Sequence, residues 1–131
     1  MIQEDYVSFE VAKLLKEKEF NWDCITYYVD SEPDDVKYSM TFENNTTWEE
    51  HWCSAPTLQM AMKWLREVHN KHCDIGYDID LEWYFQIIDL KETVEYDYPE
   101  PKFFHAKNEI GFKTYEEAVE AALKYALENL I

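Results

Sequence analysis

Histidine and cysteine, the residue types that most often bind zinc, gather in two short segments of the chain. The first is His51-Trp52-Cys53, and the second runs from His69 through His72 to Cys73. Imidazole nitrogens and thiolate sulfurs are the ligands that zinc sites use, but this spacing matches no standard zinc signature. A Cys-His nucleophile pair would also need a third, orienting residue, which no motif supplies. We therefore expect no metal site and no catalytic residue. Buried cysteines and histidines that cap a helix end explain both segments.

A second set of possible ligands is a row of carboxylates at even positions: Asp74, Asp78, Asp80 and Glu82. Such a row projects from one side of an extended segment and offers the oxygen ligands that Ca²⁺ prefers. The segment lacks the glycine and the twelve-residue ligand spacing of an EF-hand loop, and a solvated strand face explains the alternation equally well. We expect no calcium site and no cofactor.

Acidic residues dominate the chain. It carries 28 Asp and Glu against 12 Lys and Arg, a formal net charge of −16 over 131 residues. This charge disfavours direct binding to nucleic acid or to anionic membranes, which have the same sign, and it favours a basic protein partner. One group of carboxylates is Asp30, Glu32, Asp34 and Asp35. Two explanations of the acidity stay open: these residues and the loop Glu92–Glu100 together mimic the charge of a nucleic-acid backbone, or the acidic residues only keep the protein in solution.

Two tryptophans, Trp48 and Trp52, stand in a segment of Asn, Thr and Glu. Large aromatic side chains in a polar loop need either a groove on their own domain or a partner. Trp64 and Trp83, in contrast, occupy positions of apolar periodicity and are expected in the core. We take the four carboxylates above, Trp48 and Trp52 as the candidate partner-binding residues.

Three segments have helical periodicity. Ser8–Lys18 begins with a good N-cap residue, and Thr57–His69 follows Ser54 and Thr57, either of which can cap it. The third starts at Thr114-Tyr115-Glu116-Glu117, a capping box, and its apolar positions continue to the end of the sequence.

Alternation of apolar and polar residues predicts four strands, which are Cys24–Val29, Val36–Glu43, Cys73–Tyr77 and Trp83–Leu90. A polar loop is expected over Asn44–Ala55 and an acidic loop over Lys91–Lys102. The resulting order is α-ββ-α-ββ-α. It predicts an α+β fold with an antiparallel sheet of about four strands and helices mainly on one face.

The length of 131 residues suits one domain, so we expect a single compact acidic domain over residues 1–131. With 47% hydrophobic and 17% aromatic residues, the chain is not a disordered acidic tail. An odd number of cysteines and a start without a signal-peptide pattern predict the cytoplasm and no disulfide. No apolar stretch approaches the length of about 20 residues that a transmembrane helix needs.

The segments Tyr6–Phe20, Ala55–Asn70 and Tyr115–Ile131 resemble a family of small uncharacterised proteins that phages, prophages and other mobile elements of gut Bacteroidota encode. The resemblance implies a bacterial host cytoplasm as the setting. It assigns no catalytic residues.

These observations favour a non-catalytic acidic protein of a phage or mobile element that acts by protein–protein contact, for example by inhibiting a host nucleic-acid-binding or defence protein. Two alternatives stay open, a small-molecule or nucleotide-binding module that uses the loop aromatics and a small hydrolase.

Overall fold

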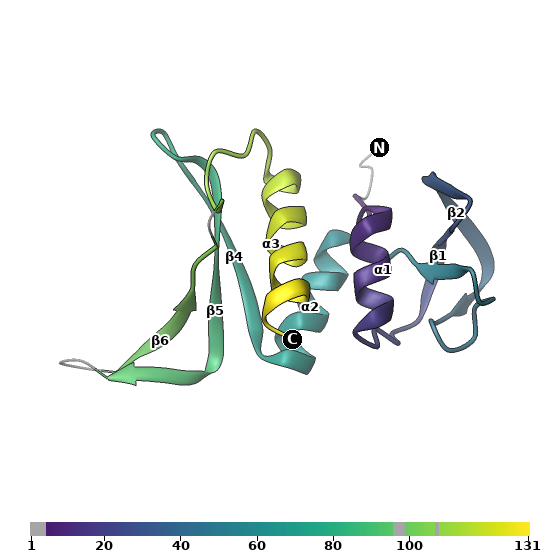
Figure 1. The fold of residues 1–131 in the computed structure, drawn as a ribbon, viewed down its shortest axis with the longest axis horizontal. Helices are drawn as coiled ribbons and strands as arrows, with labels where there is room; N and C mark the ends of the chain where they lie inside the picture. Colours follow the sequence, from purple (N-terminus) through teal and green to yellow (C-terminus); the bar gives the residue numbers. More distant parts are fainter. Residues whose placement is uncertain (1–4, 96–98, 107) are drawn as a thin grey trace. The chain divides into compact units, whose positions relative to one another are not determined.

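The computed structural model describes residues 5–95, 99–106 and 108–131. These residues form three helices and six strands (Figure 1). In chain order they are α1 (Phe9–Glu17), β1 (Cys24–Val29), β2 (Glu32–Glu43), β3 (Trp52–Ser54), α2 (Leu58–His69), β4 (Lys71–Asp78), β5 (Glu82–Glu95), β6 (Pro99–Phe104) and α3 (Tyr115–Asn129). Among them, no helix is long and apolar enough to cross a membrane.

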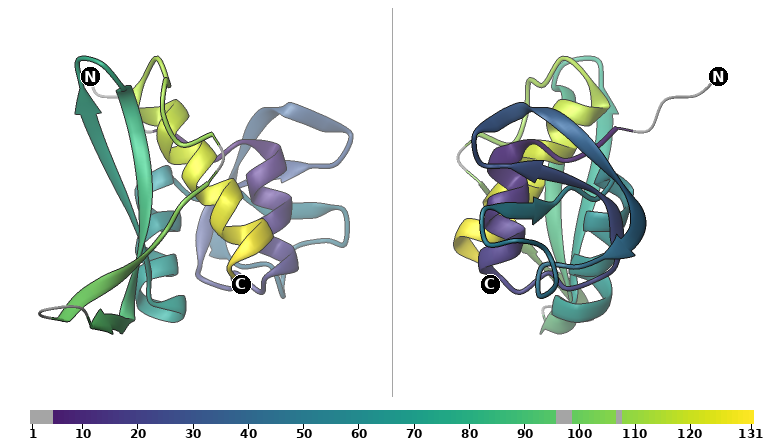
Figure 2. Two further views of the ribbon diagram at one scale, coloured as in Figure 1. Left: turned by 60° about the vertical axis from the view of Figure 1, so that its left-hand side comes forward. Right: turned by 90° about the vertical axis from the view of Figure 1, so that its right-hand side faces the viewer.

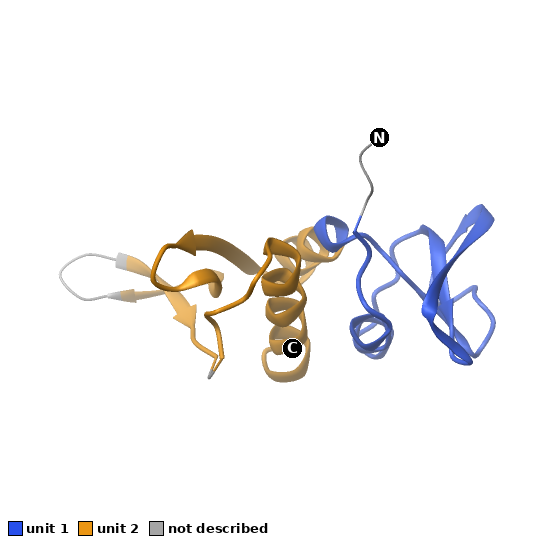
Figure 3. Cartoon of the chain, turned by 90° about the horizontal axis from the view of Figure 1, so that it is seen from above, with its two compact units in different colours: residues 1–60 blue, residues 61–131 orange. Residues whose placement is uncertain are grey.

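The chain divides into two compact units, residues 1–60 and residues 61–131, with the division inside α2 (Figure 3). We call them unit 1 and unit 2 and describe each by itself. The expectation of a single domain over the whole chain stays a prediction.

The fold is α+β, as expected, but the expected sheet of about four strands is not found in the described part of the chain. Instead, two three-stranded antiparallel sheets have the orders β2-β1-β3 and β4-β5-β6. The additional strands, β3 and β6, lie in or at the end of the segments expected to be loops. Each is a short edge strand. β3 pairs with β1, which is distant in sequence, and β6 pairs with the preceding strand β5 but contains Pro99 and Pro101, so local periodicity reveals neither strand.

The three helices begin where their capping residues predict. Ser8, Thr57 and Thr114 each accept a hydrogen bond from the backbone amide three residues later, at 3.2, 3.1 and 3.1 Å respectively. The capping box at α3 differs in one detail, because the Glu117 carboxylate accepts from the backbone amide of Lys113, at 3.1 Å, one residue before the N-cap. These bonds satisfy amides that a helix start leaves without an intrahelical partner.

In unit 1, one face of the sheet lies against α1 and forms the core (Figure 1). Along β1 the buried side chains are Cys24, Thr26 and Tyr28, which alternate with half-buried residues of the opposite face. The buried hydroxyls have acceptors, because Thr26 donates to the carbonyl of Ala55 at 2.6 Å and Tyr28 donates to the carbonyl of Val7 at 2.7 Å. The core of unit 1 therefore combines apolar packing with hydrogen-bonded polar groups.

In unit 2, α3 packs on β4 and β5 (Figure 2). Its buried residues recur at helical spacing and are Ala118, Val119, Ala122, Leu123, Ala126 and Leu127. Phe85 and Ile87 on β5 are buried as well. Trp64 is buried, as expected, whereas Trp83 is only half-buried. On the other face of the sheet, the Tyr84 ring lies directly over Gly76, where a larger residue would collide with it.

A buried carboxylate holds a bulge in β5. Between the pairs Asp89–Lys102 and Thr93–Pro101, three residues of β5 have no counterpart on β6. Asp89 accepts hydrogen bonds from the backbone amides of Lys91 and Glu92, at 2.8 and 2.9 Å, and its other oxygen is 3.1 Å from the ammonium of Lys71. The bulge is thus fixed from inside unit 2.

Candidate functional site

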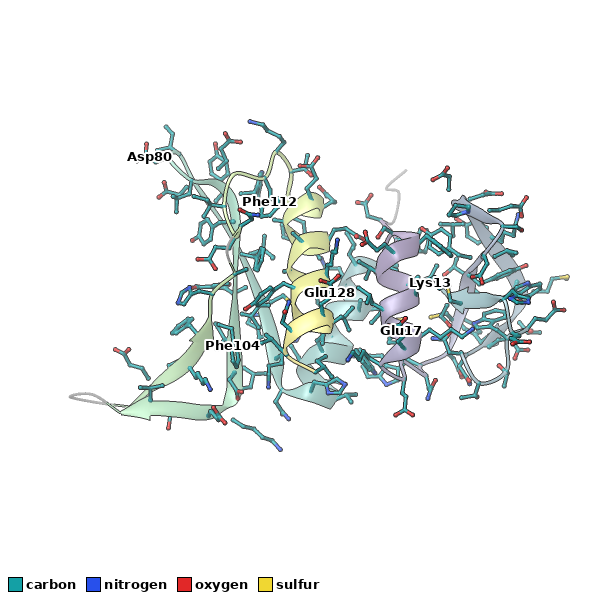
Figure 4. The ribbon with its side chains drawn as sticks, viewed as in Figure 1. Lys13, Glu17, Asp80, Phe104, Phe112 and Glu128 are labelled. Atoms are coloured by element: carbon teal, nitrogen blue, oxygen red, sulfur yellow. The ribbon has the colours of Figure 1, made fainter. Side chains whose placement is uncertain are left out.

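Two lysines partly neutralise the candidate carboxylates, of which Asp30 lies in the turn after β1 and the other three lie at the start of β2; we call these four residues the acidic turn. Lys37 lies 2.7 Å from Glu32 and 3.1 Å from Asp35, and these two hydrogen bonds raise the pKa of its ammonium group. Asp30 lies 3.7 Å from Lys13, which α1 presents (Figure 4), and also 3.7 Å from the imidazole of His51. Only Asp34, among the four candidate carboxylates, has no ion pair within the described residues. The turn carries mixed charge rather than an uninterrupted row of negative charge.

Trp48 and Trp52 pack on their own domain. The Trp52 ring stacks on Tyr27 with centroids 4.3 Å apart and an interplanar angle of 14°, and the Trp48 ring lies 4.8 Å from the same tyrosine. The indole nitrogen of Trp48 donates to the hydroxyl of Ser54 at 2.7 Å. Both tryptophans thus contact side chains of their own unit, and both remain half-buried.

The structure brings this aromatic cluster to the acidic turn. Trp52 on β3 pairs with Val29 on β1, and the backbone amide of the next residue, Asp30, donates to the carbonyl of His51 at 2.9 Å. Candidate residues from the turn and from the loop therefore lie at one end of the sheet of unit 1. Their role in binding a partner stays a prediction.

Among residues 5–60, the most exposed large apolar side chains are on β2, and the sequence analysis did not single them out. Tyr38, Met40 and Phe42 have exposed fractions of 66%, 101% and 70%. Their alternation did predict a strand, but alternation does not tell which face another element will cover. We call these three residues the β2 row.

A bulge pushes part of the β2 row out of the sheet. Between the pairs Cys24–Glu43 and Thr26–Tyr38, a single residue of β1, Ile25, faces the four residues 39–42 of β2. Two local hydrogen bonds lie at this bulge, from the Thr41 amide to the Ser39 hydroxyl and from the Thr41 hydroxyl to Glu43, each at 3.2 Å. The side chains of Met40 and Phe42 are consequently exposed to solvent.

Beside the β2 row, unit 1 has a surface cavity of about 170 Å³. Its lining residues come from the N-terminal segment, from β1 and the residue before it, from β2, and from the start of α2 and the two residues before it; they are Tyr6, Asp23, Cys24, Ile25, Thr26, Phe42, Pro56, Thr57 and Met60. Within a similar volume, an engineered apolar cavity in a protein binds benzene. The cavity therefore has room for one small apolar or aromatic group.

The cysteines are free and buried, and burial suppresses their reactivity. Burial raises the pKa of Cys24 and of Cys53 to about 11 and that of Cys73 to about 12. A thiol with such a pKa is almost entirely protonated at neutral pH, and the nucleophile in cysteine chemistry is the thiolate. His72 and Cys73 are consecutive on β4, so their side chains point to opposite faces of the sheet.

The carboxylates around the β4–β5 turn form hydrogen bonds and an ion pair with neighbouring residues of unit 2. The Gln86 amide donates to Asp74 at 2.9 Å, Asp78 accepts from the backbone amide of Asp80 at 2.8 Å, and Lys113 lies 3.1 Å from Glu82. Over residues 5–95, 99–106 and 108–131, no group of three or more His, Cys, Asp or Glu side chains is placed to hold a metal ion.

Comparison with known proteins finds no match. No protein-family model fits the chain, and no curated protein and no solved structure is significantly similar to it.

Proposed function

We propose that this chain is a non-catalytic binding protein that acts by contact with a basic protein. The β2 row carries the proposal, because three large apolar side chains exposed on one strand are a surface of the kind that marks protein–protein contact sites. Burial of these side chains by a partner would supply the hydrophobic part of the binding free energy.

The charge of unit 1 supports a basic partner. Residues 1–60 contain thirteen Asp and Glu and four Lys, a formal charge of −9. Three of those lysines already have partners inside the unit, since Lys13 and Lys37 pair with the acidic turn and Lys16 donates to the carbonyls of Glu50 and Trp52, both at 2.8 Å. The remaining negative field accelerates encounters with a positively charged surface.

The partner class that fits this surface is a nucleic-acid-binding or defence protein of a bacterial host, with the chain supplied to the cytoplasm by a phage or another mobile element. Such partners carry Lys and Arg surfaces that bind phosphates, and an acidic protein competes for these surfaces. Asp30, Glu32, Asp34, Asp35, Trp48 and Trp52 are proposed to contact the partner beside the β2 row.

A small-molecule-binding module is the second candidate. The specific observation that favours it is the cavity of about 170 Å³ beside the β2 row. The two functions differ in their dependence on salt, because attraction over long range is screened within about 8 Å at physiological ionic strength whereas contacts inside a cavity are screened much less.

Affinity capture from a bacterial lysate at low and at high salt tests the proposal, with captured proteins identified by mass spectrometry and then purified for binding measurements. We expect a basic protein whose affinity falls by about tenfold or more when salt is raised. The double variant Asp34→Lys and Asp35→Lys should slow its association. The matched control Glu116→Lys and Glu128→Lys changes the net charge equally on exposed positions of α3 and should slow association less.

Met40→Ala combined with Tyr38→Ala should speed dissociation of the same protein, because the β2 row provides contact area rather than steering. A partner that binds equally well at low and high salt and to all these variants would contradict the proposal. So would tight binding of duplex DNA by the unmodified chain.

A further inference from the structure

The walls of the cavity beside the β2 row offer almost no free polar group. The Thr26 hydroxyl donates to the carbonyl of Ala55 at 2.6 Å, and the Thr57 hydroxyl accepts from the backbone amide of Met60 at 3.1 Å. The Cys24 thiol lies 3.8 Å from the carbonyl of Trp22. Since these groups are satisfied within unit 1, the walls suit the hydrocarbon part of a ligand and not its polar end.

Two carboxylates, Asp23 and Glu43, lie at or beside the cavity, and no described lysine, arginine or histidine forms an ion pair with either of them. Asp23 is a lining residue, and the Asn44 side-chain amide donates to one of its oxygens at 3.1 Å. Glu43 is the register partner of Cys24, which also lines the cavity. Within the described residues, neither carboxylate forms an ion pair, in contrast to Asp30, Glu32 and Asp35 in the acidic turn. A group that enters this cavity therefore gains most if its outer end is cationic.

Two aromatic rings line the same cavity. Phe42 is held out by the β2 bulge, and Tyr6 packs edge-on against Tyr38 with ring centroids 6.3 Å apart. The face of an aromatic ring attracts a cation, and a planar guanidinium group also stacks on it.

We propose that this cavity binds an arginine side chain of the protein partner, with the aliphatic stem against Phe42 and Met60 and the guanidinium group at Asp23. The inference rests on the proposed function and names the chemical group that the partner inserts. Arginine fits better than lysine because its guanidinium group bonds a carboxylate through two parallel N–H groups and stacks on aromatic rings. The bound arginine would anchor a partner that the remaining charge of unit 1 steers toward it.

The test uses the full chain and a synthetic peptide with one central arginine among neutral polar residues. Matched peptides carry citrulline, which has the same shape without the charge, or lysine. An NMR titration of the ¹⁵N-labelled chain gives both the site and the dissociation constant. We expect the backbone amides of Asp23, Cys24 and Phe42 to shift, and we expect the citrulline peptide to bind about tenfold more weakly.

Variants of exposed residues separate the site from the surface around it. Asp23→Asn should weaken binding of the arginine peptide about tenfold, and Phe42→Ala about three- to fivefold. Asp34→Asn and Met40→Ala are the matched controls, because neither residue lines the cavity, and both should bind the peptide as the parent chain does.

The two proposals fail in different ways. If the captured basic protein binds as expected but Asp23→Asn changes neither its affinity nor that of the peptide, and Phe42→Ala leaves the affinity of the peptide unchanged, the arginine site is wrong and the proposed function stands. If the arginine peptide binds at the cavity as described and no basic protein binds, the proposed function is wrong and the arginine site stands. Equal binding of the citrulline peptide, or of a neutral aromatic molecule, would overturn the inference and indicate a general apolar pocket.

Discussion

The bulge in β2 of unit 1 and the bulge in β5 of unit 2 are held in opposite ways. In unit 2, the buried carboxylate of Asp89 binds two backbone amides of the bulge and the ammonium of Lys71. In unit 1, exposed side-chain hydroxyls supply the described hydrogen bonds within the bulge, and Met40 and Phe42 project from it. The same interruption of a strand ladder thus fixes a sheet in one unit and displays apolar side chains in the other.

This difference shows where each unit uses its apolar residues. The patterned face of α3 and its partners on β5 lie in the core of unit 2. In unit 1, the alternating apolar residues of β2 are exposed, although such residues normally line a core face. Because these exposed residues are not part of the core, the proposed contact with a partner rests on them.

The largest expected effect separates a core residue from a displayed one. Ile87→Ala, next to the β5 bulge, should lower the free energy of unfolding by about 2–5 kcal/mol because it leaves a cavity in a packed core. Phe42→Ala should change it by less than about 0.5 kcal/mol, as is usual for exposed positions. Urea denaturation followed by circular dichroism measures both. A loss at Phe42 as large as that at Ile87 would show that the β2 row is structural.

A smaller effect is expected at the carboxylate that holds the β5 bulge. The pKa of Asp89 is lowered from 3.8 to about 2, mainly by the hydrogen bond from the backbone amide of Glu92, against the opposing effect of burial and with further contributions from the amide of Lys91 and from Lys71. Asp89→Asn should lower the free energy of unfolding at neutral pH by about 1–3 kcal/mol, because hydrogen bonds to a charged group are lost.

The lowered pKa of Asp89 also predicts how the free energy of unfolding changes with pH. Because the folded-state pKa of Asp89 lies below its ordinary value, its contribution to stability is present above pH 3.8 and is lost as pH falls toward about 2. Unfolding curves between these two pH values should therefore converge for the parent chain and Asp89→Asn. In the exposed control Asp34→Asn, the parent's pH dependence should remain. Parallel curves for the parent chain and Asp89→Asn would contradict the assignment.

The smallest effect compares two tyrosines of unit 1. Tyr28 donates from a buried hydroxyl to the carbonyl of Val7 at 2.7 Å, whereas Tyr38 belongs to the exposed β2 row. Tyr28→Phe should lower the free energy of unfolding by about 1–2 kcal/mol, since the carbonyl of Val7 loses a buried donor. Tyr38→Phe should leave it unchanged within the error of thermal denaturation. Equal losses in both variants would place Tyr38 in the core.

Local signals in the sequence determined the helices and the long strands. The N-caps Ser8, Thr57 and Thr114 and the apolar periodicity that follows them act between residues a few positions apart, so they can be recognised without the fold. The α+β class followed from these elements. β1 has the predicted bounds, and β2, β4 and β5 are longer than predicted because pairing extends a strand into neighbouring polar residues.

Two edge strands, β3 and β6, were decided only by the tertiary structure. β3 has three residues, and β6 includes Pro99 and Pro101, which local patterning assigns to loops although proline is tolerated in an edge strand. With β3 and β6 included, the six described strands form two three-stranded sheets rather than one sheet of about four strands.

For the candidate site too, some features were determined by the sequence and others only by the tertiary structure. Composition determined the negative charge of the chain, and spacing marked the acidic turn and the loop tryptophans as surface features. Only the tertiary structure decided that Lys13 and Lys37 neutralise part of the turn, that Trp48 and Trp52 pack on Tyr27, and that an apolar cavity opens at Asp23. The physical reason is that residue type sets the charge and apolar area of a side chain, whereas its exposure and its partners depend on which distant segments pack beside it.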